Sequence, residues 1–310
     1  MKGIFKIVLL SLTIVLLISS LIIVNIIVGD ICNPEGNEIR LFEDSLGREV
    51  EVPEYPEKII SMAPAITEIL YAVEAEDKLV AVTSYCNYPE ETKNKTSIGG
   101  FSTPNIEIIV SLEPDLVIGA RDDPDIIDQL DYYNITVVIL IANSISDIFK
   151  NIEDIGWLID EKEKSKDFLD SLKARMNLIT AETSQINNSD KLTCYFEVWE
   201  TPKVAGAKSF IDDMIKKAGG INIFGDIQEE YPIVSHESVI SNNPEVIFIT
   251  AMGRDYYESN IAERSGYDVV NAVINNRIYI CDDDKFTRAG PRIIDALINM
   301  TLALYPGILD

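Results

Sequence analysis

The sequence predicts an α/β protein with two similar lobes of mainly parallel sheet, bridged by a single long α-helix. Three observations lead to this fold class. Short apolar runs alternate with amphipathic helical segments along most of the chain, a pattern typical of parallel sheets covered on both faces. One segment of the first half recurs in the second half. Between the halves lies an amphipathic segment of about 23 residues, enough for a helix of roughly 34 Å.

The first thirty residues predict a segment directed to a membrane. Lys2 and Lys6 precede an uncharged stretch, residues 7–29, which as a helix spans about 30 Å, close to the hydrocarbon thickness of a bilayer. The positive-inside rule keeps the N-terminus cytoplasmic and exports the rest. We therefore expect residues 1–29 to be an uncleaved anchor that holds the protein on the outer face of the cell membrane, with a cleaved signal peptide as the alternative.

The next segments predict an edge hairpin and a first lobe. Residues 30–57 are expected to form a linker and a hairpin, because apolar residues alternate around Asp44-Ser-Leu-Gly47. Residues 58–160 are expected to form the N-terminal α/β lobe. Its strands are expected at 58–62, 79–84, 116–119 and 137–141, and its helices at 67–75, 105–112, 125–133 and 146–159.

The bridging helix is expected within residues 161–189, from Glu161 to about Thr183. Phe168, Leu172 and Ile179 fall on one face of it. Residues 190–310 then form a C-terminal α/β lobe, beginning with the apolar run Leu192-Thr-Cys-Tyr-Phe-Glu-Val-Trp199.

The internal repeat supports two lobes built on one plan. The segment Asn105-Ile-Glu-Ile-Ile-Val-Ser-Leu-Glu-Pro-Asp-Leu-Val-Ile aligns without a gap with Ser235-His-Glu-Ser-Val-Ile-Ser-Asn-Asn-Pro-Glu-Val-Ile-Phe. In both, a capping residue opens a helix and a glutamate stands two positions further on. A proline, an acidic residue and a buried strand follow at the same spacing.

Composition excludes several classes of function. The formal net charge is −25, whereas nucleic acid requires a basic surface, so we expect no nucleic-acid partner. His236 is the only histidine, which rules out HExxH zinc sites and multi-histidine metal centres. The sequence has no GxSxG or GxGxxG motif. We therefore expect neither an enzyme nor a bound cofactor.

Two groups of residues allow more than one interpretation. The acidic runs Asp122-Asp123 and Asp282-Asp-Asp284 are interpreted as solvated loops rather than cation sites. Cys194 and Cys281 are either a disulfide bridge or two buried thiols, and the sequence leaves this open.

Candidate ligand-binding residues stand where strands give way to helices, because ligands of parallel sheets bind at the carboxyl ends of the strands. Aromatic rings with one or two arginines suit a large, partly apolar and partly anionic ligand held between two lobes. The candidates are Pro64, Tyr85, Phe101 and Arg121 in the first lobe, and Trp199, Tyr231, Asp284, Phe286 and Arg288 in the second.

Several motifs resemble a known family. They include Ile60-Ser-Met-Ala-Pro-Ala-Ile-Thr-Glu68, Thr83-Ser-Tyr-Cys-Asn-Tyr-Pro89, Gly99-Gly-Phe-Ser-Thr-Pro104 and Arg288-Ala-Gly-Pro-Arg292. These resemble the class III periplasmic binding proteins, which serve ABC importers of cobalamin, siderophores and haem. The similarity runs from about residue 40 to the end, and the segment around Tyr85 is most similar to the cobalamin branch.

The resemblance implies two Rossmann-like lobes with little hinge motion. It also implies that an exposed glutamate on each lobe docks with arginines of the permease. Glu107 and Glu237 match those positions, and they are the two glutamates that the internal repeat aligns. The simpler interpretation of either residue is a carboxylate favoured near a helix N-terminus.

The resemblance further implies a corrinoid ligand, a monomeric receptor and contacts from Tyr85, Phe101, Tyr231, Asp284 and Arg288. Phe101 and Tyr231 replace tryptophans of the best-known cobalamin receptor, and Ala120 replaces a further ring. A ferric siderophore or haem is the alternative ligand, for which Arg121, Arg254 and Arg288 would neutralise anionic oxygens. The competing classes are an enzyme on a chelatase-like fold and a surface protein without a transport role.

Overall fold

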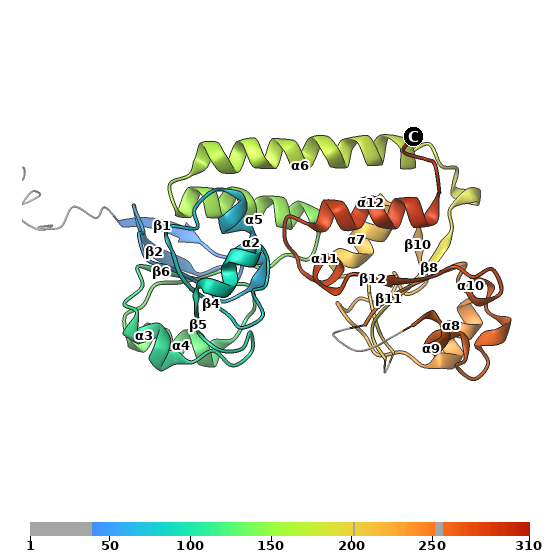
Figure 1. Ribbon diagram of the computed structural model, residues 1–310, viewed down its shortest axis with the longest axis horizontal. Helices are drawn as coiled ribbons and strands as arrows, with labels where there is room; N and C mark the ends of the chain where they lie inside the picture. The colour runs from blue at the N-terminus through green and yellow to red at the C-terminus, as the bar shows by residue number, and fades with distance from the viewer. Residues whose placement is uncertain (1–38, 201, 252–256) are drawn as a thin grey trace, which may run out of the picture.

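A computed structural model describes residues 39–200, 202–251 and 257–310. The expected anchor at residues 1–29 and Arg254 lie outside these residues. Within them, no helix is long and apolar enough to cross a membrane. Two lobes lie side by side, and the long helix α6 (Lys162–Thr183) runs over both of them (Figure 1). The predicted α/β class is confirmed.

The N-terminal lobe contains a five-stranded parallel sheet in the order β5-β4-β3-β6-β7. Its strands are β3 (Ile59–Ser61), β4 (Leu79–Val82), β5 (Thr96–Ser97), β6 (Leu116–Gly119) and β7 (Val137–Ile139). Its helices are α2 (Pro64–Ala72), α3 (Ile106–Ser111), α4 (Pro124–Tyr132) and α5 (Ile145–Leu158). The expected hairpin is formed by β1 (Ile39–Glu43) and β2 (Glu49–Pro53), which pair antiparallel. Helices and long strands thus fall within a few residues of their expected positions.

The C-terminal lobe contains the parallel order β10-β8-β11-β12, with β9 antiparallel to β8. Its strands are β8 (Thr193–Trp199), β9 (Lys203–Val204), β10 (Ile221–Asn222), β11 (Val246–Thr250) and β12 (Ile278–Cys281). Its helices are α7 (Phe210–Lys217), α8 (His236–Asn242), α9 (Glu258–Ala262), α10 (Asn271–Ile274), α11 (Asp283–Thr287) and α12 (Ile293–Leu304).

The two sheets share one topology, as the repeat predicts. The order β4-β3-β6-β7 corresponds to β10-β8-β11-β12, and α3 precedes β6 as α8 precedes β11. Both helices begin with a side-chain cap. Asn105 accepts a hydrogen bond from the backbone N–H of Ile108 at 3.0 Å, and Ser235 accepts one from the backbone N–H of Ser238 at 3.2 Å.

The ends of these two helices also correspond. Glu113 and Asn243 adopt left-handed backbone conformations, with φ of 48° and 44°, and each precedes a proline. The acid after the proline then binds the start of the neighbouring strand. Asp115 accepts from the backbone N–H of Lys58 at 2.7 Å, and Glu245 accepts from the backbone N–H of Thr193 at 2.9 Å. The repeat is therefore one structural unit used twice.

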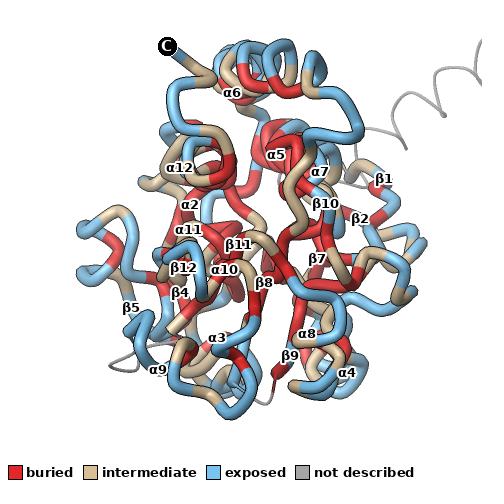
Figure 2. Tube along the Cα trace, turned by 90° about the vertical axis from the view of Figure 1, so that its right-hand side faces the viewer, coloured by how far each residue is buried: buried red, intermediate tan, exposed pale blue. Residues whose placement is uncertain are grey.

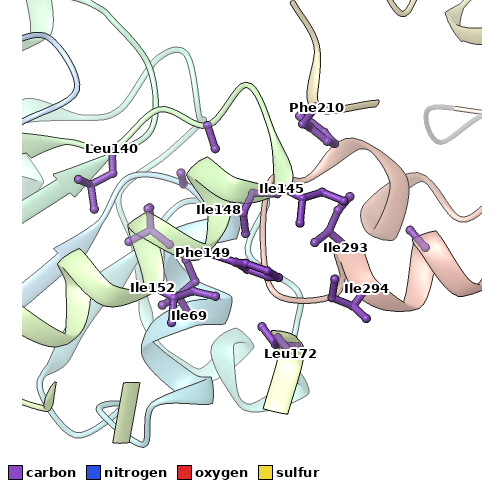
Figure 3. Close-up of a cluster of buried hydrophobic side chains, with 14 of the residues drawn as sticks. Ile69, Leu140, Ile145, Ile148, Phe149, Ile152, Leu172, Phe210, Ile293 and Ile294 are labelled. Atoms are coloured by element: carbon purple, nitrogen blue, oxygen red, sulfur yellow. The ribbon is translucent and has the colours of Figure 1, made fainter. Parts of the chain in front are cut away.

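A single hydrophobic core runs under α6 and through both lobes. It includes Phe149 of α5, Phe210 of α7, Ile293 and Ile294 of α12, and Leu172 of α6 (Figure 3). The predicted bridging helix is present as α6, and the lobes also meet through direct packing that the sequence analysis does not predict. The helices that cover the α6 side of each sheet also pack against those of the other lobe, as α5 does against α7.

Each lobe has a second core on the opposite face of its sheet. In the N-terminal lobe this core contains Ile109 and Leu130, and in the C-terminal lobe it contains Val239 and Tyr267. The helices that cover these faces, α3 with α4 and α8 with α9, lie on the side of the molecule away from α6 (Figure 1).

The three cysteines among the described residues are buried thiols. Cys86, Cys194 and Cys281 are free. Cys194 is on β8 and Cys281 on β12, and β11 lies between these strands. Two strand spacings separate the Cα atoms by at least about 9 Å, which is beyond the reach of a disulfide. Of the two interpretations left open by the sequence, the buried thiols are confirmed.

Candidate ligand-binding site

The N-terminal half of the site is built on the carboxyl end of β6. Arg121 lies over the ring of Phe101, with its guanidinium carbon 5.7 Å from the ring centroid. Its charge is paired with Asp123 at 3.0 Å. Asp123 also caps α4, where it accepts a hydrogen bond from the backbone N–H of Ile126 at 3.4 Å. A small pocket of about 10 Å³ opens beside Ala120, in the place where the resemblance implies a lost ring.

The loop after β4 presents Tyr85. Its side chain is 61% exposed. The next residue, Cys86, is buried and lies 3.2 Å from the hydroxyl oxygens of both Thr67 and Thr83. The buried thiol therefore fixes the loop, while the tyrosine ring beside it remains available to a ligand.

In the C-terminal half, alternate residues of α11 face opposite ways. Asp284 and Arg288 form an ion pair at 2.6 Å. Phe286, between them, is 3% exposed and stacks on Phe196 with ring centroids 6.1 Å apart. Phe286 is therefore part of the core of its lobe, and we leave it out of the candidate site. Asp282 caps the start of the helix, where its side chain accepts a hydrogen bond from the backbone N–H of Lys285 at 3.0 Å.

Charged residues join the two lobes directly. Glu68 of α2 accepts hydrogen bonds from Arg288 at 3.1 Å and from Arg292 at 2.6 and 2.9 Å. Arg288 also donates to the backbone carbonyl of Tyr85 at 3.0 Å and to the side chain of Asn87 at 2.8 Å. We call Glu68, Asn87, Asp284, Arg288 and Arg292 the inter-lobe ion cluster.

The sequence reasoning missed Glu68, Asn87 and Arg292. One signal was present, because Glu68 lies within the apolar segment Ala65-Ile-Thr-Glu-Ile-Leu70. A carboxylate at such a helix position requires a buried cation as its partner. The identity of that partner was not available from the sequence, since Arg288 lies 220 residues further along the chain.

Trp199 and Tyr231 both belong to the C-terminal lobe. Trp199 ends β8 and is 38% exposed. Tyr231 is half-buried against the shared core, and the Lys203 ammonium lies 5.8 Å from its ring centroid. Burial raises the pKa of the Tyr231 hydroxyl, and the neighbouring Glu230 raises it further, so the phenol stays protonated.

Contacts among the expected residues form two groups. Tyr85, Asp284 and Arg288 belong to one cluster, and Phe101 with Arg121 forms a second. Pro64 begins α2, where its fixed φ suits the first helical position. Metal ligation finds no support among the described residues, where no three acidic, histidine or cysteine side chains converge.

Comparison with known proteins decides the family. Residues 59–285 match the model of the periplasmic binding protein family. The chain belongs to this family. Over 272 residues it is 30% identical to an uncharacterised ABC transporter substrate-binding lipoprotein of Bacillus subtilis, and the match covers 85% of each protein. The chain is a substrate-binding protein of an ABC transporter.

Two solved structures show the same architecture. The periplasmic vitamin B12-binding protein of Vibrio cholerae superposes with a TM-score of 0.70 at 27% identity, covering 80% of this chain and 96% of that protein. The periplasmic haem-binding protein of Roseiflexus sp. RS-1 superposes with a TM-score of 0.71 at 27% identity, covering 81% and 99%.

In this substrate-binding protein, Glu107 and Glu237 occupy equivalent places. Both are exposed in the first turn of their helices, α3 and α8. These helices lie on the side of the molecule away from α6 (Figure 1). Hydrogen bonds from its own backbone N–H and from the Ser235 hydroxyl lower the pKa of Glu237 from its ordinary value. The neighbouring His236 contacts the Tyr267 hydroxyl through Nδ1 at 3.0 Å.

Proposed function

We propose that the chain captures a corrinoid, such as cobalamin or cobinamide, outside the cell and delivers it to the permease of an ABC importer. The observation that carries this proposal is the charge pairing of the candidate site. Arg121 is paired with Asp123, and Arg288 and Arg292 are paired with Glu68 and Asp284.

This pairing favours a ligand that needs few free cations. A ferric siderophore carries several anionic oxygens, which the carboxylates paired with these arginines would repel. The siderophore would have to displace those carboxylates before it could bind the arginines. A corrinoid presents a flat ring rimmed by amides, which suits exposed aromatic side chains such as Tyr85 and Trp199 together with fixed polar groups.

Haem is the second candidate, and the similarity to the Roseiflexus haem-binding protein is the observation that favours it. Haem iron usually takes a histidine, cysteine, methionine or tyrosine ligand. His236, which begins helix α8, is hydrogen-bonded to the Tyr267 hydroxyl, and Cys86, Cys194 and Cys281 are buried. Tyr85 and Tyr88, which are both exposed in the inter-lobe region, would be the candidate tyrosine ligands. A corrinoid requires no such ligand, so we place it first.

Delivery requires a docking surface on each lobe. We assign this role to Glu107 and Glu237, whose exposed carboxylates would pair with arginines of the permease. The same proposal keeps residues 1–29 as the segment that tethers the receptor to the outer face of the membrane, and treats the receptor as a monomer.

The ligand assignment is tested by titration calorimetry of the purified chain with cobalamin, cobinamide, haemin and a ferric catecholate. We expect heat with at least one corrinoid and weaker binding of the anionic chelates. Tyr85→Ala should weaken corrinoid binding about tenfold through the loss of ring contact. Tyr132→Ala is the matched control, because Tyr132 is 80% exposed at the end of α4. The assignment is wrong if neither corrinoid binds.

A further inference from the structure

We propose that Glu68 is a positioning residue for the ligand site: it anchors the segments that carry Tyr85 and Asp284 and holds the lobes together at one end of their interface. The inference rests on the proposed site but assigns it a residue that makes no contact with ligand. Glu68 is 3% exposed and lies in α2, on the N-terminal lobe. Its two oxygens are shared by two arginines of the other lobe.

One carboxylate thereby orders two loops. Through Arg288 it fixes the carbonyl of Tyr85, the side chain of Asn87 and the carboxylate of Asp284. The side-chain amide of Asn87 also donates a hydrogen bond to the carboxylate of Asp284 at 2.8 Å, so Asn87, Asp284 and Arg288 all contact one another. Arg292 lies over the Tyr88 ring, with its guanidinium carbon 4.3 Å from the centroid. Tyr85, Asn87 and Tyr88 thus each contact Arg288 or Arg292, the two arginines that bind Glu68. The remaining residue of this loop, Cys86, is buried.

The backbones of the lobes also abut beside this cluster. A Cβ at Gly290 would lie 3.3 Å from the Cα of Ala65 and 3.5 Å from Glu68 Oε2. The absence of a side chain at Gly290 therefore lets the loop between α11 and α12 approach the first turn of α2. This approach brings Arg288 and Arg292 within reach of one glutamate.

The opposite end of the interface lacks such a cluster. Among the described residues, the corresponding polar contact is a single hydrogen bond, from the backbone N–H of Ile145 to Asp213 at 2.9 Å. Asp213 is also paired with Lys217 of its own helix at 2.8 Å. Figure 2 shows the two ends apart, with α2, α11 and α12 on one side and α5 and α7 on the other. The lobes are therefore held asymmetrically, and they separate more readily at the Asp213 end.

Charge balance explains why the anchor is a carboxylate. Glu68 and Asp284 together offset Arg288 and Arg292, and the side chain of Glu68 is 1% exposed. Without the charge of Glu68, two guanidinium groups that are 13% and 14% exposed would share one carboxylate. Removing one member of a buried charge group leaves the others uncompensated. The segments would then separate or rearrange.

The test compares Glu68→Gln with Asp213→Asn as the matched control at the other end. Nitroxide labels at Tyr132→Cys and Ile274→Cys, both exposed and one on each lobe, report the inter-lobe distance by pulsed electron paramagnetic resonance. Cys32→Ser removes the cysteine outside the described residues, and the other three are buried. We expect Glu68→Gln to broaden the distance distribution without ligand and to raise the corrinoid Kd about tenfold, while Asp213→Asn changes both far less.

Identical distance distributions for Glu68→Gln and the parent would overturn the inference, as would a lowered thermal midpoint with an unchanged Kd. If Glu68→Gln does not fold, Asn87→Ala takes its place, because Asn87 is exposed and its loss frees only Arg288 and Asp284. It should broaden the distribution to a smaller extent, and no change would again overturn the inference. Absence of corrinoid binding by the parent would refute the proposed function alone, since the distance measurement needs no ligand.

Discussion

Each lobe contains a buried carboxylate that is paired with arginine. Glu197 of β8 has a side chain that is 1% exposed and receives two hydrogen bonds from Arg264, at 2.6 and 2.7 Å. The Tyr195 hydroxyl donates a further one at 2.5 Å. Glu68 holds the same kind of position in the other lobe. Each acid is stable in the interior only because its partners are fixed by the rest of the fold.

The buried thiols give a prediction at this scale. Burial raises the pKa of Cys194 from its ordinary value of 9.0 to about 12, and it also raises the pKa of Cys281. With Cys32→Ser, the native protein should show no reaction with a thiol-specific reagent at pH 8.5, and three thiols should react in urea. Rapid reaction of Cys194 or Cys281 in the native state would contradict the buried arrangement.

The same shift predicts the direction of a stability change with pH. Because the folded-state pKa of Cys194 lies above the unfolded value, its contribution to the free energy of unfolding is complete below pH 9.0. It falls as the pH rises from 9.0 towards 12, since the unfolded chain then releases protons that the folded chain retains. Urea unfolding at pH 8 and pH 10 checks this, with Cys194→Ala expected to show a smaller decrease than the parent.

Individual site residues were predictable only in part. Tyr85, Asp284 and Arg288 could be proposed from the sequence because polar and aromatic residues at the carboxyl ends of parallel strands are exposed to a common edge. Their contact with a ligand stays a prediction. Phe286 follows the same rule in sequence but faces inward, because it is two residues from Asp284 on a helix. The arginine partners of Glu68 and Glu197 could not be found, because pairing across more than sixty residues leaves no local pattern.

At the scale of elements, the repeated unit from helix to strand was the most predictable part of the chain. Its caps, its proline and its buried strand are all local signals, and α3 and α8 lie where those signals place them. The short elements β5, β9 and β10 were missed. Each has two residues, too few for a periodic pattern, so only the neighbouring strand defines it.

Asp115 and Glu245, the acids that follow the two prolines, should contribute similar amounts to the free energy of unfolding. Asp115→Ala removes acceptors for the backbone N–H groups of Glu57 and Lys58, and Glu245→Ala removes those for the Thr193 backbone and hydroxyl. We expect each change to lower the free energy of unfolding by about 1–3 kcal/mol. Urea denaturation measures this. Asp131→Ala, on the exposed side of α4, is the control and should cost less than about 0.5 kcal/mol.

The proposed docking role of Glu107 and Glu237, in the first turns of α3 and α8, can be tested by measuring uptake. In cells that depend on corrinoid uptake, Glu107→Ala combined with Glu237→Ala should reduce uptake severely while leaving corrinoid affinity unchanged, because neither glutamate belongs to the ligand site. Glu163→Ala is the control, since Glu163 stands exposed in the first turn of α6 on the opposite side. Normal uptake by the double variant would exclude docking through these two residues.

At the scale of the whole molecule, the lobes are joined by the expected long helix and also by a shared hydrophobic core. The long helix was predictable, because its apolar face repeats over many turns, and α6 spans Lys162–Thr183 against an expected range of Glu161 to about Thr183. The shared core was not. An apolar face shows that a helix is buried but does not identify the surface that covers it. Phe149 and Ile293 come from different lobes and meet only in the assembled structure (Figure 3).

A shared core predicts that the lobes unfold together. The chain has two tryptophans, Trp157 in α5 and Trp199 at the end of β8, so each lobe carries its own fluorescent reporter. The variants Trp157→Phe and Trp199→Phe should show coincident urea transitions. Phe149→Ala should shift both midpoints, with a loss of about 3–5 kcal/mol. Separate transitions for the two reporters would show independent lobes.

The continuity of that core also bears on how a bound molecule leaves. Pulling the lobes apart would expose Phe149, Phe210, Ile293 and Ile294 to water, at a cost of about 25 cal/mol for each Å² of apolar surface uncovered. We therefore expect thermal motion alone to separate the lobes widely only rarely. Under the docking role that we propose for Glu107 and Glu237, the permease would have to do mechanical work to separate the two halves, and it would act at these two exposed glutamates.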